Sequence, residues 1–205
     1  MKNITTIFFF VLTFFFFSSV QIFAAGTARW TGRTSTAWET ASNWSTVTGT
    51  PSFPPSSNDA VIIGDTIFTA QPVVNSNTTI SSLAFDSTTS ATLTVSNGVT
   101  LTVTNAVTMK SATLISTSAI ITGSGTISSA SVTCGTAGAS NLPLADRTTI
   151  LTTTINTFNV TNGVTVTSYK NGGSTNLATF QLSTGTMTVG TTITMSASGG
   201  ANGAI

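Results

Sequence analysis

Histidine is absent from this 205-residue chain, cysteine occurs once, at Cys134, and charged residues make up only 5% of the sequence. An ordinary soluble domain carries about 25% charged residues. Without histidine, the usual general base, the Ser-His-Asp arrangement and most zinc sites are excluded. With one cysteine, a disulfide within the chain is excluded, so Cys134 is either a small buried hydrophobe or a link to another molecule.

Charge of either sign is too scarce for a nucleic-acid partner. The chain has six basic and five acidic residues, and Lys2 lies in an expected leader that is removed. The remaining balance provides no basic stripe that would neutralise phosphates. We therefore expect no nucleic acid among the partners of this protein.

With histidine absent, carboxylates are the remaining route to catalysis. Some polysaccharide lyases and hydrolases use clustered acids with or without Ca²⁺. The sequence separation of Asp65 and Asp86 is close to the length of one repeat in a solenoid, about 20 to 25 residues, so a repeating fold would bring them near each other as a weak candidate Ca²⁺ site. Two side chains fall short of the six to eight oxygens that Ca²⁺ prefers. Asp59 is expected to cap a corner by accepting hydrogen bonds from backbone N–H groups. We therefore expect no catalytic residue, no cofactor and no enzymatic activity.

Residues 1–25 have the organisation of a secretory signal peptide. Lys2 precedes an apolar run from Ile7 to Phe17, and small residues follow at 24–26. The core of a bilayer needs about 20 apolar residues and this run is shorter. A cleaved leader is therefore favoured over an anchor, with cleavage between Ala24 and Ala28. The mature chain is expected to be secreted or at the cell surface, without a transmembrane segment.

Alternation of aliphatic residues with threonine indicates β structure, most clearly in TLTVSNGVTLTVTNAVTM at residues 92–109. β-branched residues suit a pleated surface, and Asn-Gly groups mark corners. The sequence Asn-Gly-Val-Thr occurs twice, around Gly98 and around Gly163. The separation of these two glycines is close to three turns of about 20 to 25 residues each. The pattern predicts an all-β fold, a right-handed parallel β-helix, over residues 58–205.

Successive turns of this coil can be aligned by their apolar positions. Four segments, which begin at Ile62, Leu83, Val107 and Val132, superimpose when the sequence is divided at those positions. Equivalent positions of a parallel coil stack about 4.8 Å apart. We therefore expect Phe85, Met109 and Cys134 to form one inward column. The final SASGGANGAI contains no capping element, so we expect the natural product to continue beyond it.

Residues 26–57 differ in composition, because all three tryptophans and a Pro-rich corner lie here. The arrangement W-x-G…W…A-x-N-W…P…D-x-V-x-I, followed by Thr-rich repeats, resembles the beginning of the passenger regions of secreted bacterial surface proteins. These are adhesin-like β-helix proteins of autotransporter type and their Bacteroidota counterparts. The resemblance implies a parallel β-helix displayed at or released from the cell surface, often without enzymatic activity.

Trp30, Trp38 and Trp44 have two interpretations. An open solenoid exposes the apolar end of its first coil, and large aromatic side chains in residues 26–57 would cover that end as a cap. Alternatively, the tryptophans form an exposed platform on which sugars stack. Two further candidate surfaces are excursions from the repeat at residues 134–147 and at Tyr169 to Asn176, because loops on rigid scaffolds often bind ligands. Tyr169 is the only tyrosine of the chain.

The sequence therefore predicts a non-catalytic extracellular or cell-surface protein, adhesin-like or structural, that makes weak repeated contacts to glycans or neighbouring cells. The alternative is the N-terminal part of a carbohydrate-active β-helix enzyme, a lyase or hydrolase whose catalytic turns lie downstream. A remote alternative is an ice-binding solenoid, because stacked Thr-x-Thr pairs would form a regular hydroxyl array. The candidate pairs are Thr92/Thr94, Thr100/Thr102 and Thr165/Thr167.

Overall fold

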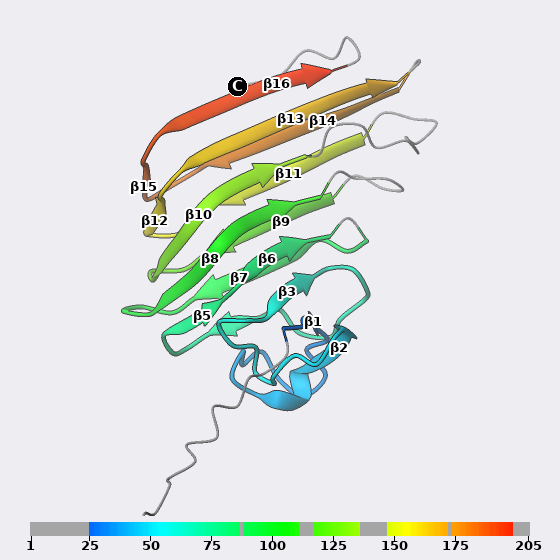
Figure 1. Ribbon diagram of the computed structural model, residues 1–205, viewed down its shortest axis with the longest axis vertical. Coiled ribbons are helices and arrows are strands. Elements are labelled where there is room, and N and C mark those ends of the chain that lie inside the picture. The colour runs from blue at the N-terminus through cyan, green and yellow to red at the C-terminus, as the bar shows by residue number, and fades with distance from the viewer. Residues whose placement is uncertain (1–24, 87, 111–116, 136–146, 172–173, 199–205) are drawn as a thin grey trace, which may run out of the picture.

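A computed structural model describes residues 25–86, 88–110, 117–135, 147–171 and 174–198 (Figure 1). Strands account for nearly all the regular structure of this part, and most of them pair in parallel into one continuous stack. The prediction of an all-β parallel solenoid is confirmed. None of the helices in the described ranges has the length and apolarity needed to cross a bilayer.

The strands wind around three sides of the coil, which we call faces A, B and C. Face A contains β3 (Ala60–Ile63), β6 (Ser82–Phe85), the second halves of β8 (Thr100–Met109) and β10 (Thr126–Cys134), β13 (Gly163–Asn171) and β16 (Thr192–Ser198). Face B contains β5 (Thr78–Ile80), the first halves of β8 and β10, β12 (Thr157–Val160) and β15 (Thr186–Val189). Face C contains β4 (Val73–Val74), β7 (Ala91–Val95), β9 (Thr117–Thr122), β11 (Arg147–Thr153) and β14 (Ser174–Leu182).

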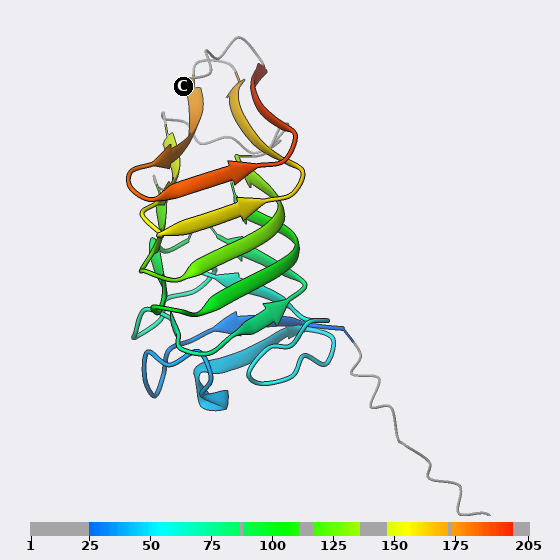
Figure 2. The same cartoon turned by 90° about the vertical axis from the view of Figure 1, so that its left-hand side faces the viewer.

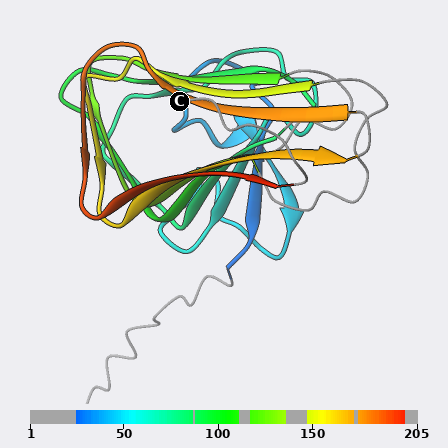
Figure 3. The same cartoon turned by 90° about the horizontal axis from the view of Figure 1, so that it is seen from above.

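The coil is right-handed. Seen from the C-terminal end, β14 runs to the left along one side, β15 runs down the next and β16 runs to the right along the third, while the chain rises toward the viewer (Figure 3). This hand is the one expected for parallel crossovers of right-twisted strands.

The register of face A confirms most of the predicted alignment. Phe85 pairs with Met109, and Met109 pairs with Cys134, and all three side chains are buried. The predicted column therefore exists, and it extends to Ile63 before it and to Val166 and Met195 after it. Burial of a large apolar side chain of this kind stabilises the fold by about 1.5–3 kcal/mol.

One step of the predicted alignment is wrong by a single position. Val61, and not Ile62, lies against Leu83, and Ile62 lies against Ala84. The segment 60–63 reads Ala-Val-Ile-Ile and has no polar position to identify its outward face. Because side chains alternate with a period of two, a pattern without alternation leaves the register open by one position.

The interpretation of the repeated Asn-Gly-Val-Thr sequence as a spacing of three turns is also wrong. The positions stacked on face A are Val61, Leu83, Val107, Val132, Val164 and Ile193, so the turns after Val132 are longer than those before it. Val164, which follows Gly163, therefore lies in the column of Val107 and not in that of Val99. The two Asn-Gly groups occupy different corners of the coil, because the turns vary in length with the connections between faces.

The tryptophan segment lies at the N-terminal end of the described coil. It contains β1 (Thr27–Trp30), the 3-10 helix η1 (Ala41–Asn43) and β2 (Trp44–Thr48). β1 runs parallel to β3 and antiparallel to β2, so β2 forms the outer edge of face A at this end (Figure 1). The interpretation of residues 26–57 as a cap stays a prediction.

Candidate functional site

The three tryptophans are buried against one another. Trp30 and Trp38 are 0% exposed and Trp44 is 5% exposed. The Trp44 ring lies edge-on to both others, with centroids 5.0 Å from Trp30 and 4.6 Å from Trp38. The Trp30 indole N–H donates to the Ala70 carbonyl and that of Trp44 to the Trp38 carbonyl, each at 2.7 Å. Their faces are therefore not open to a sugar, contrary to the geometry that an exposed platform needs.

The segment around Tyr169 is a hairpin rather than the expected loop. Tyr169 pairs with Asn176 and Asn171 with Ser174, as the end of β13 turns back into β14. The Tyr169 side chain lies outside the described part of the structure, as do residues 136–146 of the other predicted excursion. The segment therefore departs from the parallel coil, as predicted, but the residues that flank Gly172-Gly173 are paired strands.

The two carboxylates of the candidate Ca²⁺ site each lie against a basic side chain. Asp65 Oδ2 is 2.6 Å from Arg29 Nε, and Asp86 Oδ2 is 2.7 Å from Lys110 Nζ. The register of face A places Ile63 against Phe85, so Asp65 and Asp86 are not at equivalent positions of successive turns. Within the described residues, no three His, Cys, Asp or Glu side chains gather where a metal ion would need them. The Ca²⁺ site itself stays a prediction.

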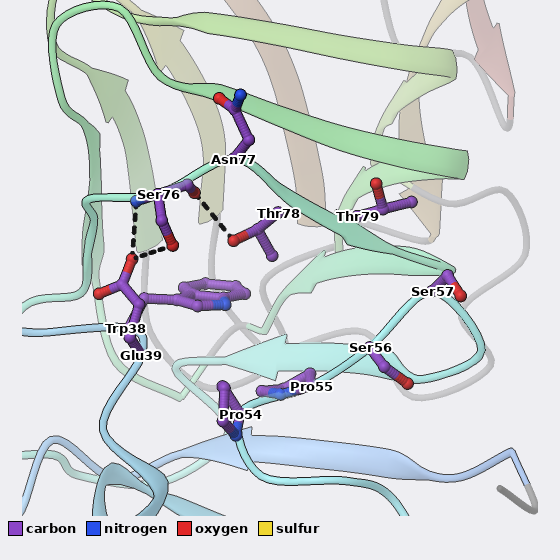
Figure 4. A pocket seen from close by; sticks show the side chains of 10 residues that line it. All are labelled: Trp38, Glu39, Pro54, Pro55, Ser56, Ser57, Ser76, Asn77, Thr78 and Thr79. Atoms are coloured by element: carbon purple, nitrogen blue, oxygen red, sulfur yellow. Dashed lines mark hydrogen bonds between the residues drawn. The ribbon is translucent and has the colours of Figure 1, made fainter. Parts of the chain in front are cut away.

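A cleft opens where the tryptophan segment meets the first strand of face B. Its volume is about 550 Å³. Figure 4 shows the Trp38 indole between two chain segments, Pro54–Ser57 on one side and Ser76–Thr79 on the other. Apart from Trp38, the two prolines and Glu39, the side chains that line the cleft are hydroxyls and one amide, at Ser56, Ser57, Ser76, Asn77, Thr78 and Thr79. The cleft therefore combines an apolar floor with neutral hydrogen-bonding groups and one carboxylate, that of Glu39.

Glu39 fixes one wall of this cleft. Its Oε1 accepts hydrogen bonds from the backbone N–H groups of Asn75 and Ser76, at 2.7 and 2.9 Å, and from the Ser76 hydroxyl at 3.1 Å. Partial burial alone would raise the pKa of Glu39, but these hydrogen bonds outweigh it and hold the pKa below its ordinary value. The carboxylate therefore stays ionised and holds the segment that leads into β5.

Asp59 holds the opposite wall. Its wholly buried carboxylate accepts four hydrogen bonds through Oδ2, from the backbone N–H and hydroxyl groups of Ser52 and Ser56, at 2.5 to 3.2 Å. The expectation that Asp59 caps a corner is confirmed. Burial by itself would raise its pKa, but the four donors together lower the pKa below the ordinary value. Asp59 thereby orders the Pro54–Ser57 segment that faces Trp38.

The Trp38 indole N–H has no hydrogen-bond partner among the described residues, although it is buried. A buried donor without an acceptor costs about 1–3 kcal/mol. Trp38 is thus the member of the tryptophan cluster that borders the cleft and whose polar group remains unsatisfied. An acceptor that reached this N–H would recover part of that free energy.

Two columns of hydroxyl and amide side chains continue from the cleft along face B, which Figure 2 shows toward the viewer. Registers of β8, β10, β12 and β15 place one column at Thr100, Thr126, Thr157 and Thr186, and the second at Thr79, Thr102, Ser128, Asn159 and Thr188. These side chains alternate with inward-facing ones and are partly or fully exposed. No charged residue occurs on these strands. We call this surface the hydroxyl ladder.

The Thr-x-Thr pairs singled out from the sequence lie on three different faces. Thr92/Thr94 is on β7 of face C, Thr100/Thr102 on β8 of face B and Thr165/Thr167 on β13 of face A. They do not stack on one another. The stacked set on face B was missed because its members, for example Thr126 and Ser128, align only when turns of unequal length are superimposed.

Comparison of the chain with protein-family models, with curated proteins and with solved structures found no match. The geometry of the cleft and the hydroxyl ladder is therefore the basis for assigning a role to this protein.

Proposed function

We propose that this protein is a secreted or cell-surface β-helix without catalytic activity, adhesin-like or structural, that makes weak repeated contacts to neutral glycans. The observation that carries the proposal is the continuity of the cleft with the hydroxyl ladder, since Thr79 belongs to both. Hydroxyl and amide groups exchange hydrogen bonds with sugar hydroxyls, and the absence of charge on these strands suits a neutral chain.

The affinity is expected to come from repetition. A single neutral hydrogen bond contributes only about 0.5–1.5 kcal/mol net. The hydroxyl ladder presents similar groups on each successive turn of face B, so a long glycan can contact several turns at once and gain avidity.

A glycan array probed with the mature chain tests this proposal. The wild-type protein is expected to bind neutral polysaccharides, and Thr79→Val, which removes one hydroxyl and keeps the shape, is expected to weaken binding roughly threefold to tenfold. Thr46→Val is the matched control, because Thr46 is an exposed strand threonine on β2, away from the ladder. Trp44→Ala is a poor probe because Trp44 is buried. Wild-type signals no higher than background would rule out the proposal.

Ice binding is a second candidate, and the register of face B favours it. The pairs Thr100/Thr102 and Thr186/Thr188 are separated by two turns with Thr-x-Ser and Thr-x-Asn at the same positions. Turns about 4.8 Å apart, with side chains at every second position along each strand, form a regular grid of hydroxyls that would order water.

Inhibition of ice recrystallisation distinguishes this second candidate. Thr157→Lys places a long charged side chain in the middle of the ladder, whereas Thr152→Lys places it on β11 of face C. Both threonines are partly exposed. An ice-binding face B predicts activity that Thr157→Lys abolishes and Thr152→Lys preserves. Absence of activity in the wild-type protein would leave glycan contact as the better assignment of the ladder.

A further inference from the structure

The sequence Asn-Gly-Val-Thr occurs at residues 97–100 and again at residues 162–165, and the fold gives the two occurrences different surroundings. An asparagine that precedes glycine is prone to lose ammonia spontaneously, because glycine has no side chain to hinder attack by its backbone nitrogen. In an unfolded chain the two occurrences have the same local chemistry. A difference between them in the folded protein therefore comes from the tertiary structure.

The reaction joins the backbone nitrogen of the glycine to the Cγ atom of the asparagine. A C–N bond forms, the bond from Cγ to the amide nitrogen breaks, and ammonia leaves with the proton of the glycine N–H. The product is a five-membered succinimide ring. Water then opens the ring at either carbonyl and gives aspartate or isoaspartate, without oxidation or reduction. The backbone between the two residues must rotate before the ring can close.

The first occurrence lies in an open corner between β7 and β8. Asn97 and Gly98 belong to neither strand, and both are exposed. The corner is closed by one hydrogen bond, from the Val99 N–H to the Ser96 carbonyl at 3.1 Å. Apart from its chain neighbours, no atom of the described residues lies within 4 Å of the position that a Gly98 Cβ would take. The Asn97 side chain therefore has room to approach the Gly98 nitrogen.

The second occurrence is held between neighbouring turns. The Asn162 N–H donates to the Ala130 carbonyl at 2.8 Å, and the Asn162 carbonyl accepts from the N–H and the hydroxyl of Thr191. Gly163 is the first residue of β13 and pairs with Thr192. A Cβ on Gly163 would lie 2.7 Å from the Thr192 carbonyl oxygen. Rotation of the backbone here would break these hydrogen bonds, so the reaction needs local opening of the coil.

We propose that Asn97 is a site of spontaneous deamidation in the folded protein and that Asn162 is protected from it. The product carries a new negative charge, in a chain that has only five acidic residues. Isoaspartate also adds one atom to the backbone of the corner. Asn97 lies shortly before Thr100, a member of the hydroxyl ladder, so the new charge lies at the border of face B. The modification does not depend on the proposed glycan contacts, because it requires only water.

Peptide mapping by mass spectrometry, after incubation at mildly alkaline pH, tests this site. The mature chain is incubated folded and, in parallel, unfolded in guanidinium, until the unfolded chain has reacted at both positions. Lys110 and Arg147 lie between the two asparagines, so trypsin places them in different peptides. In the folded chain, Asn97 is expected to react roughly tenfold or more faster than Asn162, which needs local opening. In guanidinium the two rates are expected to be similar.

Asn97→Gln is the matched control, because it keeps an amide at the corner but lengthens the side chain, which disfavours the five-membered ring. This variant is expected to lose the product from the peptide that contains position 97 and to leave the rate at Asn162 unchanged. Three results would overturn the proposal. These are a folded chain in which Asn97 stays intact after the unfolded chain has reacted, equal rates at the two asparagines in the folded chain, or a product in that peptide that persists in Asn97→Gln.

Discussion

The few carboxylates of this protein hold pieces of its backbone in place. Glu39 accepts two backbone N–H groups ahead of β5, and Asp59 accepts two in the Pro-rich corner. Each of these N–H groups would otherwise need another acceptor or water. In a chain with 5% charged residues, a single acidic side chain therefore determines the shape of each wall of the cleft.

Asp59→Asn is expected to destabilise the fold by about 2 kcal/mol, because a neutral amide accepts the four hydrogen bonds of the carboxylate less strongly. The pKa of Asp59 is lowered in the folded state. Its stabilisation is therefore present above the unfolded value of about 3.9 and is lost as the pH falls through the folded pKa. Urea unfolding of both proteins at neutral pH and in acid checks this. A difference in stability that did not shrink in acid would contradict the assignment.

Cys134 behaves as a core residue and not as a reactive thiol. Its side chain is 0% exposed, and burial raises its pKa to about 11, although hydrogen bonds with backbone groups of Leu151 and Thr179 partly offset this. The thiolate is the reactive form, so we expect negligible modification by a thiol reagent at neutral pH in the native protein. Complete modification is expected in guanidinium. Rapid labelling of the folded chain would show that the inward column opens readily.

At the level of elements, glycine allows a positive φ at several corners, and at some of them it also packs closely against a neighbouring turn. Gly123 has φ +111°, and a Cβ there would collide with the backbone of Val95. Gly98 also has a positive φ, +72°, but no atom lies within 4 Å of the position that its Cβ would take. Substitution of these two glycines therefore distinguishes two free-energy costs. At Gly98 only the backbone conformation is unfavourable, whereas at Gly123 close packing against a neighbouring turn adds to it.

Gly98→Ala is expected to cost about 1–2 kcal/mol, which is the penalty of a left-handed conformation for a residue with a Cβ. Gly123→Ala is expected to cost more than that, because the backbone of Val95 must also move. Denaturant unfolding of the two variants measures the difference. Equal costs would mean that the corner at Gly123 relaxes without disturbing the turn beneath it.

The residue pattern of each strand explains which part of the alignment of successive turns could be predicted from the sequence. β6, β8 and β10 alternate apolar with small or hydroxyl residues along most of their length, so their inward columns could be aligned correctly before the structure was known. β3 is apolar throughout, and its register differs from the prediction by one position. For such a strand, only the packing of its neighbours decides which side chains face inward.

For the whole molecule, stability is expected to depend on position along the coil. Each turn of a solenoid contacts only its neighbours, so a side chain between two turns makes contacts that a side chain at an open end lacks. Met109 and Met195 occupy the same inward column, one in the middle and one at the end. Met109 is 1% exposed, whereas Met195 is only partly buried.

Met109→Ala is expected to destabilise the fold by about 2–5 kcal/mol, as for other buried methionines that leave a cavity. Met195→Ala is expected to cost less, because Met195 is only partly buried and its truncation removes fewer contacts. Urea unfolding of both variants makes the comparison. A loss at Met195 as large as that at Met109 would contradict this expectation.

The candidate site was visible in the sequence only in part. Trp38 and Asp59 were recognised individually. Asp59 was expected to cap a corner, as it does, and Trp38 was expected to belong to a cap or to a stacking platform, of which its burial rules out the platform. Glu39 carried no motif, because its partners Asn75 and Ser76 are distant in the sequence. The hydroxyl ladder was not recognised because Thr126 and Thr157 are aligned by the turn between them and not by a repeated motif.

The sequence by itself determined that this protein is a coil of β-strands with aliphatic residues inside and hydroxyls outside. Alternation is a local property with a period of two, and it can be read along each strand. Only the tertiary structure decided the register of β3, the burial of the tryptophans, the cleft and the ladder. The ladder depends on turns of unequal length, and the other three depend on packing between segments that are distant in the sequence.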